Sequence, residues 1–435
     1  MVCFPGRCLG ADVPTRSAPE FLPPDRLVLS DGRELTVHFD ETRVPSFALP
    51  DPLILESGEA VTSIEGWRHR RAEILELFRT HVYGRSPGGP DSLRSEVLAS
   101  NPSALGGRAV REQVRLFFGQ RSTPRLDVLI YRPAAADAAV PAFLGLNFFG
   151  NHSIHADPGI ALSDQWMPDD PKRGIEDHRA TEGSRGSAAS RWPVETIVER
   201  GYALVTAYCG DLDPDFDDGF QNGVHPLFYR KGQSRPDPDQ WGGIGAWAWG
   251  LSRILDLLES HSAIDHQRVA VVGHSRLGKT ALWAAAQDER FALAISNESG
   301  CGGASLSRRR FGETVEAITT QFPHWFARNF EHYAGREDAL PVDQHMLLAL
   351  VAPRPLYVAS AALDLWADPR GEFLAVKAAE PVYHLLGTGG LDTDAMPEVD
   401  RPTGNVLAYH VRSGGHDLSR WDWLRYLAFA DRHLS

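Results

Sequence analysis

The stretch GHSRLGKT at residues 273–280 decides how this sequence folds, and it fits two different chemistries. Letter for letter it matches the phosphate-binding loop G-x-x-x-x-G-K-[ST] of nucleotide-binding proteins. It also places Ser275 two residues after a glycine that ends an apolar strand pattern, directly before a helical pattern. An α/β-hydrolase carries its nucleophile at such a strand-to-helix turn. The choice between the two interpretations therefore predicts both the fold and the chemistry.

Three features of the surrounding sequence argue against a phosphate-binding loop. The positions that would curl around a phosphate hold the bulky residues His274, Arg276 and Leu277. At least three strand patterns precede the motif, whereas such a loop usually follows the first strand of its domain. No later apolar run ends in an aspartate suited to magnesium, because the nearest candidate, Asp364, follows small residues. A nucleotide-binding protein remains an alternative, but the sequence favours the hydrolase.

Strand and helix patterns alternate along most of the chain. Apolar runs of strand length occur at 126–131, 141–147, 203–208, 269–273, 291–296, 356–360 and 406–411. Helical patterns occur at 66–82, 193–200, 243–258, 279–287, 371–379 and 419–434. Continuous apolar strands that alternate with helices predict a mostly parallel central sheet with helices on both faces. The predicted fold class is therefore α/β, in the three-layer sandwich of the α/β-hydrolases.

The predicted domain organisation is simple. Residues 1–35 are rich in proline and lack periodicity, which predicts an irregular N-terminal arm. Residues 36–435 are predicted to form a single domain. Within it, the polar segment at 157–192 is expected to be a surface insertion near the active site.

Composition limits the classes of partner. The net charge of −13 argues against nucleic acid and against an anionic membrane surface. No run of 18 apolar residues predicts a transmembrane helix, and residues 1–17 lack the apolar core of a signal peptide. The four cysteines are too few and too scattered for a disulfide framework.

A serine nucleophile needs a histidine base and a carboxylate that orients it. His416 lies in the glycine-rich loop RSGGHD at 412–417, between the last strand pattern and the last helical pattern, where this fold places its base. Glu298 and Asp364 each follow a predicted strand downstream of Ser275, so both are candidates for the acid. Asp364 is at the more usual position, and Asp368 is expected to serve the Asp-Pro turn.

The acidic run DLDPDFDDG at 211–219 has the alternating carboxylates of a calcium loop. An EF-hand needs a glutamate at its twelfth position, which is Asn222 here, and Pro214 interrupts the run. We therefore expect a loop beside the active-site cleft and no bound metal.

The elbow departs from the general G-x-S-x-G pattern, because the second glycine is displaced to Gly278. With this feature the chain resembles the glucuronoyl esterases, carbohydrate esterase family 15, whose elbow reads G-[CH]-S-R-x-G-K. The resemblance extends to NESGCGG at 297–303, DLWADPRGEF at 364–373 and GGH at 414–416, and it spans roughly residues 36–435.

The resemblance implies roles for residues at matching positions. Ser275 would be the nucleophile and His416 the base, with Glu298 as the acid of the fungal enzymes and Asp364 as a second acid of the bacterial ones. Arg276 would stabilise the oxyanion. The family contacts the sugar acid at positions that correspond to Lys279, Glu313, Gln321 and Trp366. His274 and Asp417 stand where fungal members have two disulfide-bonded cysteines, so that bridge is absent.

The resemblance further implies a serine esterase without a cofactor. Its substrate would be an ester of (4-O-methyl-)glucuronic acid, as in linkages between glucuronoxylan and lignin, and it would act as a secreted or periplasmic monomer. Another carbohydrate esterase, such as an acetyl-xylan esterase, and an inactive carbohydrate-binding homologue are the alternatives.

Overall fold

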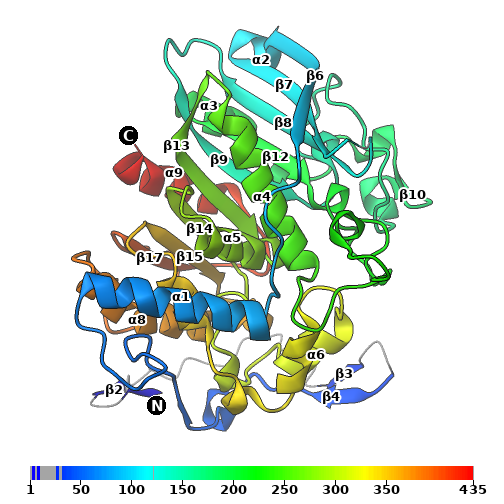
Figure 1. The fold of residues 1–435 in the computed structure, drawn as a ribbon. Helices are drawn as coiled ribbons and strands as arrows, with labels where there is room; N and C mark the ends of the chain where they lie inside the picture. Colours follow the sequence, from blue (N-terminus) through cyan, green and yellow to red (C-terminus); the bar gives the residue numbers. More distant parts are fainter. Residues whose placement is uncertain (1, 5–6, 10–25, 29–31, 121, 435) are drawn as a thin grey trace.

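The computed structural model describes residues 2–4, 7–9, 26–28, 32–120 and 122–434. A ten-stranded sheet runs through the molecule in the order β16-β17-β15-β14-β13-β9-β12-β8-β7-β6 (Figure 1). Its parallel strands are β9 (Val140–Asn147), β12 (Ala203–Tyr208), β13 (Ile264–His274), β14 (Leu293–Asn297), β15 (Leu356–Ala361) and β17 (Leu407–Arg412). The mostly parallel sheet that the sequence predicts is therefore present.

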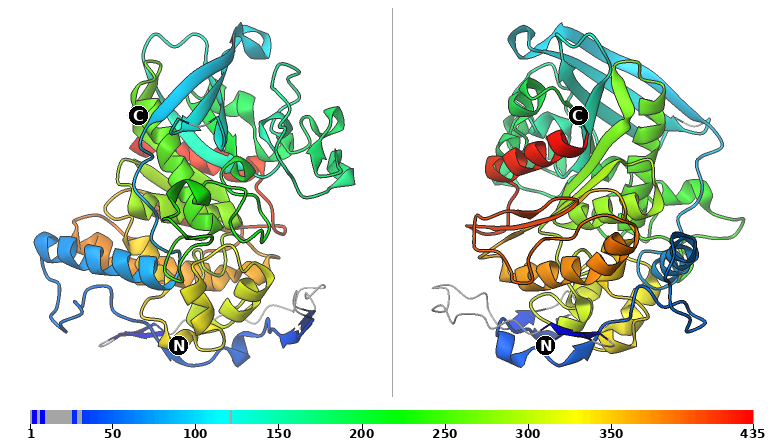
Figure 2. Two further views of the ribbon diagram at one scale, coloured as in Figure 1. Left: turned by 45° about the vertical axis from the view of Figure 1, so that its right-hand side comes forward. Right: turned by 90° about the vertical axis from the view of Figure 1, so that its left-hand side faces the viewer.

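Helices cover both faces of this sheet, and each face has its own hydrophobic core. On one face α4 (Gly243–Glu259), α5 (Arg276–Gln287) and α8 (Pro369–Leu385) contact the strands, with α7 (Gln344–Ala349) and α1 (Ile64–His81) packed outside them. On the other face lie α3 (Val194–Glu199) and α9 (Arg420–His433). The right-hand view in Figure 2 shows α9, in red, across the sheet from the longer green helix α4. This is the predicted three-layer sandwich.

One end of the sheet differs from the sequence prediction. Strands β6 (Leu93–Ser103), β7 (Ala109–Phe118) and β8 (Arg125–Pro133) form an antiparallel meander, and β8 also pairs antiparallel with β12. Only β8 is predicted from the sequence. The edge strand β6 is largely exposed, so it lacks the continuous apolar run by which the other strands are recognised.

Helix boundaries also differ in one place that matters for function. The pattern predicts a helix from residue 279, but α5 begins at Arg276, directly after Ser275. The short helix α6 (Val315–Gln321) and α7 are not predicted, since both are only about two turns long.

The described part of the N-terminal arm contains short strands that its sequence does not predict. Strand β1 (Val2–Phe4) pairs with β2 (Arg7–Leu9), and β3 (Arg26–Val28) pairs with β4 (Glu34–Thr36). Segment 157–192 contains a two-stranded ribbon, β10 (Ile175–Glu176) with β11 (Arg179–Ala180), between short 3-10 helices. In the part of the chain that the structure describes, no helix is both long enough and apolar enough to span a bilayer.

Candidate active site

Four adjacent parallel strands, β13, β14, β15 and β17, bring the predicted catalytic residues to one edge of the sheet. Ser275 follows β13 directly, and Glu298 follows β14 directly. Asp364 lies three residues after the end of β15, and His416 lies four residues after the end of β17. Because the carboxyl ends of parallel strands share an edge, residues that are far apart in the sequence meet there.

Ser275 occupies a strained turn. Its backbone has φ 58° and ψ −129°, a conformation that is rare for a residue with a side chain. The turn requires glycine at position 273, because a Cβ there would lie 1.9 Å from the carbonyl oxygen of Leu277. A Cβ at Gly278 would lie 3.0 Å from the Cβ of Ser299, so the displaced glycine allows α5 to pack closely against the end of β14.

The same turn excludes the phosphate-binding interpretation. Strand β13 ends at His274 and α5 begins at Arg276, so a single residue links them. A phosphate-binding loop needs several residues between strand and helix to wrap its backbone N–H groups around the phosphates. Such a loop is not present at 273–280.

His416 is placed beside this elbow and faces both candidate acids. Its ring lies 4.5 Å from the ring of His274, the residue before Ser275. Its Nδ1 is 2.6 Å from Oδ2 of Asp364 and 3.3 Å from Oε2 of Glu298. Burial by itself would lower the pKa of His416, but hydrogen bonds to the two carboxylates raise it to about 9. Asp364 is thus the closer partner.

Glu298 is buried and lies closer to its other hydrogen-bond partners than to His416. Its Oε1 accepts a hydrogen bond of 2.6 Å from Arg412, and its Oε2 accepts one of 2.9 Å from the backbone N–H of Asp417. Burial raises the pKa of Glu298 to about 7, although His416 and Arg412 favour its charged form. The charge of Asp364 adds to the rise in the pKa of Glu298.

Arg276 is held in place by an acid from the predicted cleft loop. Its Nε lies 2.6 Å from Oδ2 of Asp215, and its guanidinium lies 4.5 Å from the ring centroid of Phe148. Asp215 also accepts hydrogen bonds from Nε2 of His324 at 3.0 Å and from Nε1 of Trp325 at 2.7 Å. Burial favours the neutral carboxyl, but Arg276 and these donors hold the pKa of Asp215 below its usual range.

The predicted sugar-contacting residues divide into a cluster and an outlier. Lys279 is buried, donates to the carbonyl of Ser299 at 2.6 Å, and lies 4.0 Å from Oε2 of Glu313. The backbone N–H of Glu313 donates to the carbonyl of Trp366, and a hydrogen bond from the Trp366 side chain to the carboxyl of Glu313 adds the indole to this group. Gln321 ends α6, and its described side-chain hydrogen bond goes to the carbonyl of Val28 on β3, which is not a member of the cluster.

The acidic loop at 211–219 uses its carboxylates within the protein. Asp211 accepts from the N–H of Asp127, Asp213 pairs with the buried His225, and Asp218 accepts from backbone N–H groups of its own turn. Among the described residues, one group of His and acidic side chains is close enough to share an ion, namely Glu298, Asp364 and His416. The guanidinium of Arg412 against Glu298 opposes a cation there.

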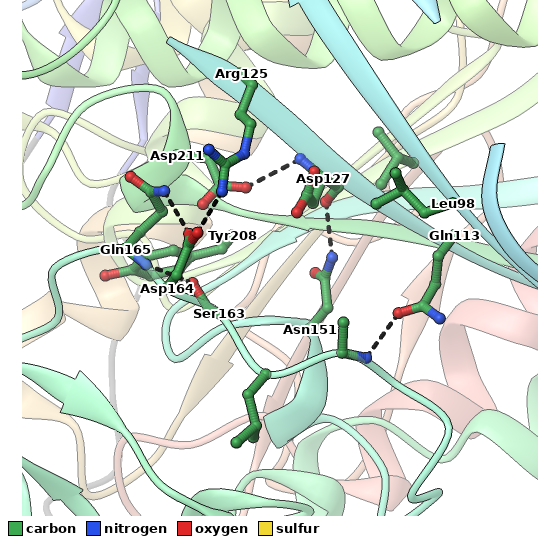
Figure 3. Close-up of a pocket in the computed structure, with 13 residues that line it drawn as sticks. Leu98, Gln113, Arg125, Asp127, Asn151, Ser163, Asp164, Gln165, Tyr208 and Asp211 are labelled. Carbon is green, nitrogen blue, oxygen red and sulfur yellow. Dashed lines mark hydrogen bonds and ion pairs between the residues drawn. The ribbon is translucent and has the colours of Figure 1, made fainter. Parts of the chain in front are cut away.

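A polar pocket lies at the same edge of the sheet but farther along it, between β7, β8 and the segment around residue 163 (Figure 3). Its charged groups have partners within the protein. Arg125 pairs with Asp164, and Asn151 donates to the carbonyl of Asp127. These contacts within the protein therefore explain the polar lining of the pocket.

Comparisons with known proteins identify the family of this chain. The family model of fungal glucuronyl esterases matches residues 229–387. Carbohydrate esterase MZ0003, from an unknown prokaryotic organism, is 51% identical over 400 residues, which are 92% of this chain and 92% of that protein. The solved glucuronoyl esterase from Solibacter usitatus is 47% identical, with a TM-score of 0.86, and the match covers 91% of this chain and 100% of that one. The chain belongs to carbohydrate esterase family 15, the glucuronoyl esterases.

This family 15 protein is a carboxylic ester hydrolase. It is also similar to a fungal relative, the 4-O-methyl-glucuronoyl methylesterase of Thermothelomyces thermophilus. That protein is 30% identical over 341 residues, which are 76% of this esterase and 70% of the relative. The family resemblance and the fold predicted from the sequence are both confirmed, whereas the roles of single residues stay predictions.

Sequence reasoning missed two residues that hold the predicted site residues in place. Asp215 holds Arg276, and Arg412 holds Glu298. Asp215 belongs to the acidic run, but nothing in the sequence indicates that it pairs with Arg276, 61 positions away. Arg412 is the first residue of the quoted loop RSGGHD, and its position four residues before His416 was the only available signal.

Proposed function

We propose that this esterase hydrolyses esters of (4-O-methyl-)glucuronic acid through an acyl-enzyme on Ser275. The observation that carries the proposal is the hydrogen bond of 2.6 Å between His416 and Asp364, beside a serine held in a strained elbow. A serine, a histidine and a carboxylate in this arrangement form the site of a serine hydrolase. The relatives named glucuronoyl esterases support the substrate class.

In the first half of the reaction, Oγ of Ser275 attacks the ester carbonyl carbon while His416 takes the hydroxyl proton. Asp364 accepts a hydrogen bond from the other ring nitrogen and stabilises the imidazolium. The oxyanion of the tetrahedral intermediate lies next to the cationic Arg276, and one well-placed donor lowers such a barrier by roughly 3–4 kcal/mol. The intermediate then expels the alcohol, which takes the proton from His416.

In the second half, water attacks the acyl-enzyme and His416 again takes a proton. Collapse of the second tetrahedral intermediate frees the uronic acid and returns the proton to Ser275. No step needs a cofactor, and we expect activity to be unchanged by a chelator such as EDTA.

The substrate side of the proposal rests on the cluster around Lys279. An ammonium and a buried carboxyl 4.0 Å apart offer both donors and an acceptor to sugar hydroxyls. The indole of Trp366 offers an apolar face on which a pyranose ring can pack. We also propose that Gln321, at the end of α6, contacts the sugar through its amide.

The decisive experiment is the change Ser275→Ala, tested on benzyl glucuronate. We expect hydrolysis to fall to background while the circular dichroism spectrum stays that of the unchanged protein, because removing a small hydroxyl leaves the elbow intact. Activity retained by this variant would contradict the assignment. Failure of a fluorophosphonate to label the unchanged protein would favour an inactive carbohydrate-binding homologue.

An acetyl-xylan esterase is the competing enzyme, and Lys279 separates the two. Lys279→Ala should raise KM for methyl glucuronate but leave hydrolysis of acetylated xylose unchanged, because an acetyl group presents no uronate to the lysine. The opposite substrate preference would point to the acetyl esterase.

We also infer that the enzyme acts as a monomer outside the cytoplasm. A glucuronoxylan–lignin ester is a polymer that cannot enter a cell, and every residue proposed for the site comes from one chain. Gel filtration with light scattering, and localisation of the protein in its source organism, test the two parts.

A further inference from the structure

Arg412, the last residue of β17, contacts nearly every part of the loop that carries His416. Its Nη1 donates to the carbonyl of Ser413 at 2.9 Å, and its Nη2 donates to the carbonyls of Gly415 at 2.8 Å and Asp417 at 2.7 Å. These carbonyls lie before and after His416 in the chain. A loop with two consecutive glycines has large conformational freedom, and these bonds restrict it.

The guanidinium is itself fixed by a buried acid on the last helix. Nε of Arg412 donates to Oδ2 of Asp422 at 3.1 Å, and Asp422 also accepts from Nε2 of His410 at 3.0 Å. Oδ2 of Asp422 further closes the capping box of α9 with Ser419. The rigid N-terminus of α9 therefore determines where the guanidinium lies.

On its other side, Arg412 is the counter-charge of Glu298. The two side chains are buried and meet at 2.6 Å, and Oε2 of Glu298 accepts from the backbone N–H of Asp417. A buried carboxylate that loses its cation either becomes protonated or destabilises its surroundings. Glu298 lies 3.3 Å from Nδ1 of His416, so its charge acts directly on the base.

We propose that Arg412 is a positioning residue for the esterase reaction: anchored by Asp422, it orders the loop that carries His416 and favours the charged form of Glu298 beside the imidazole. Arg412 itself does not need to touch the substrate. It acts through His416 and Glu298, and by engaging Glu298 it leaves Asp364 as the closer partner of the imidazole. This inference rests on the function proposed above.

The first test compares Arg412→Met with Arg412→Lys in the hydrolysis of benzyl glucuronate. Loss of the geometry around a catalytic base costs about 100-fold in kcat, and the methionine variant should show a loss of this size. KM should change little, because the sugar-contacting cluster lies on other elements. The lysine variant keeps the charge without the fork of donors, so it should recover part of the lost kcat. Equal activity of the two variants, or a change confined to KM, would refute the proposal.

The second test is a double-mutant cycle with Glu298→Gln. In this background Glu298 is no longer a carboxylate that needs Arg412 as its cation, so Arg412→Met should lower kcat by a clearly smaller factor than in the unchanged protein. The same factor in both backgrounds would mean that Arg412 does not act through Glu298.

Arg354 provides a matched control at the opposite end of the sheet. Arg354 lies just before β15, and its guanidinium donates to the backbone carbonyls of Ala285, Asp288 and Phe291. Arg354→Met should lower the melting temperature without the specific loss of kcat. If Arg412→Met does not fold, Arg412→Lys and Arg412→Gln carry both tests.

The rate at which a fluorophosphonate labels Ser275 separates this inference from the proposed substrate. Labelling depends on the base His416 but not on a sugar. A protein that labels well yet leaves glucuronate esters intact would contradict the substrate class alone. Labelling that is as fast in Arg412→Met as in the unchanged protein would overturn the role of Arg412.

Discussion

Two carboxylates share one imidazole nitrogen in this site, and their surroundings differ more than their distances. Asp364 bonds to Nδ1 of His416 at 2.6 Å, whereas Glu298 is 3.3 Å away and is already bonded to Arg412 and to the backbone N–H of Asp417. A carboxylate whose charge is partly neutralised by a cation attracts an imidazolium less strongly. Asp364 is therefore the main partner of His416, the proposed base.

This difference predicts unequal effects of two conservative variants. Asp364→Asn should lower kcat/KM by at least about 100-fold, since the amide cannot stabilise the imidazolium. Glu298→Gln should cost about 10-fold or less, because Asp364 still orients the ring. Steady-state kinetics with benzyl glucuronate measures both, and the reverse order would mean that Glu298 is the main acid.

The same contacts predict the pH dependence of the reaction. The base must be neutral to accept the serine proton, and the pKa of His416 is raised to about 9. In the free enzyme kcat/KM should therefore rise with pH above the ordinary histidine range. Asp364→Asn removes a hydrogen bond that raises this pKa, so its profile should shift to lower pH. A profile that does not move would contradict the pairing of His416 with Asp364.

Asp215 gives a further prediction at this scale. It holds Nε of Arg276 at 2.6 Å, and Asp215→Asn would remove the charge that fixes the guanidinium. Because Arg276 is proposed to act on the transition state, kcat should fall by about 10-fold with little change in KM. A change in KM alone would place Arg276 in substrate binding.

At the scale of elements, the elbow between β13 and α5 depends on a close approach of backbone to backbone. A Cβ at Gly273 would meet the carbonyl oxygen of Leu277 at 1.9 Å and its carbon at 2.3 Å, and neither atom can rotate away. The start of α5 would have to move, and with it Ser275.

Gly273→Ala should therefore damage both stability and activity. The clash is with main chain, so we expect a loss of at least about 3 kcal/mol in the free energy of unfolding, measured by urea denaturation. Gly387→Ala is a useful comparison, because nothing lies within 4 Å of a Cβ there, although its positive φ also adds strain. Equal losses in the two variants would show that the close approach at Gly273 is unimportant.

At the scale of the whole molecule, acids buried between sheet and helices make stability depend on pH. Glu372 on α8 is fully buried, accepts from the N–H of Gly300 at 2.9 Å, and is hydrogen-bonded to Ser360. Burial raises its pKa to about 8. The folded protein therefore keeps a proton that the unfolded chain releases near pH 4.5.

The stability contributed by the neutral Glu372 is complete below about pH 4.5 and is lost progressively as the pH rises to about 8. Glu372→Gln mimics the neutral acid at every pH. Its free energy of unfolding should therefore fall less than that of the unchanged protein over this interval, by a difference on the order of a few kcal/mol. Thermal unfolding at a series of pH values tests this, and parallel curves would contradict it.

The sequence by itself determined the features that depend on local order. A strand, a serine and a helix within 273–280 specify the elbow, and the glycine-rich loop before the last helix identifies His416. Alternation of apolar strands with helices specifies the parallel part of the sheet, because strands that are buried on both faces have continuous apolar sequences.

The tertiary structure decided what depends on distances between remote residues. Asp364 and Glu298 are 52 and 118 positions from His416, and only packing at the sheet edge sets one at 2.6 Å and the other at 3.3 Å. The contacts of Arg412 and Asp215, and the exposed edge strand β6, have no local signature either. Hydrogen bonds and ion pairs change strongly within less than one ångström, whereas a sequence pattern fixes only which strand end a residue follows.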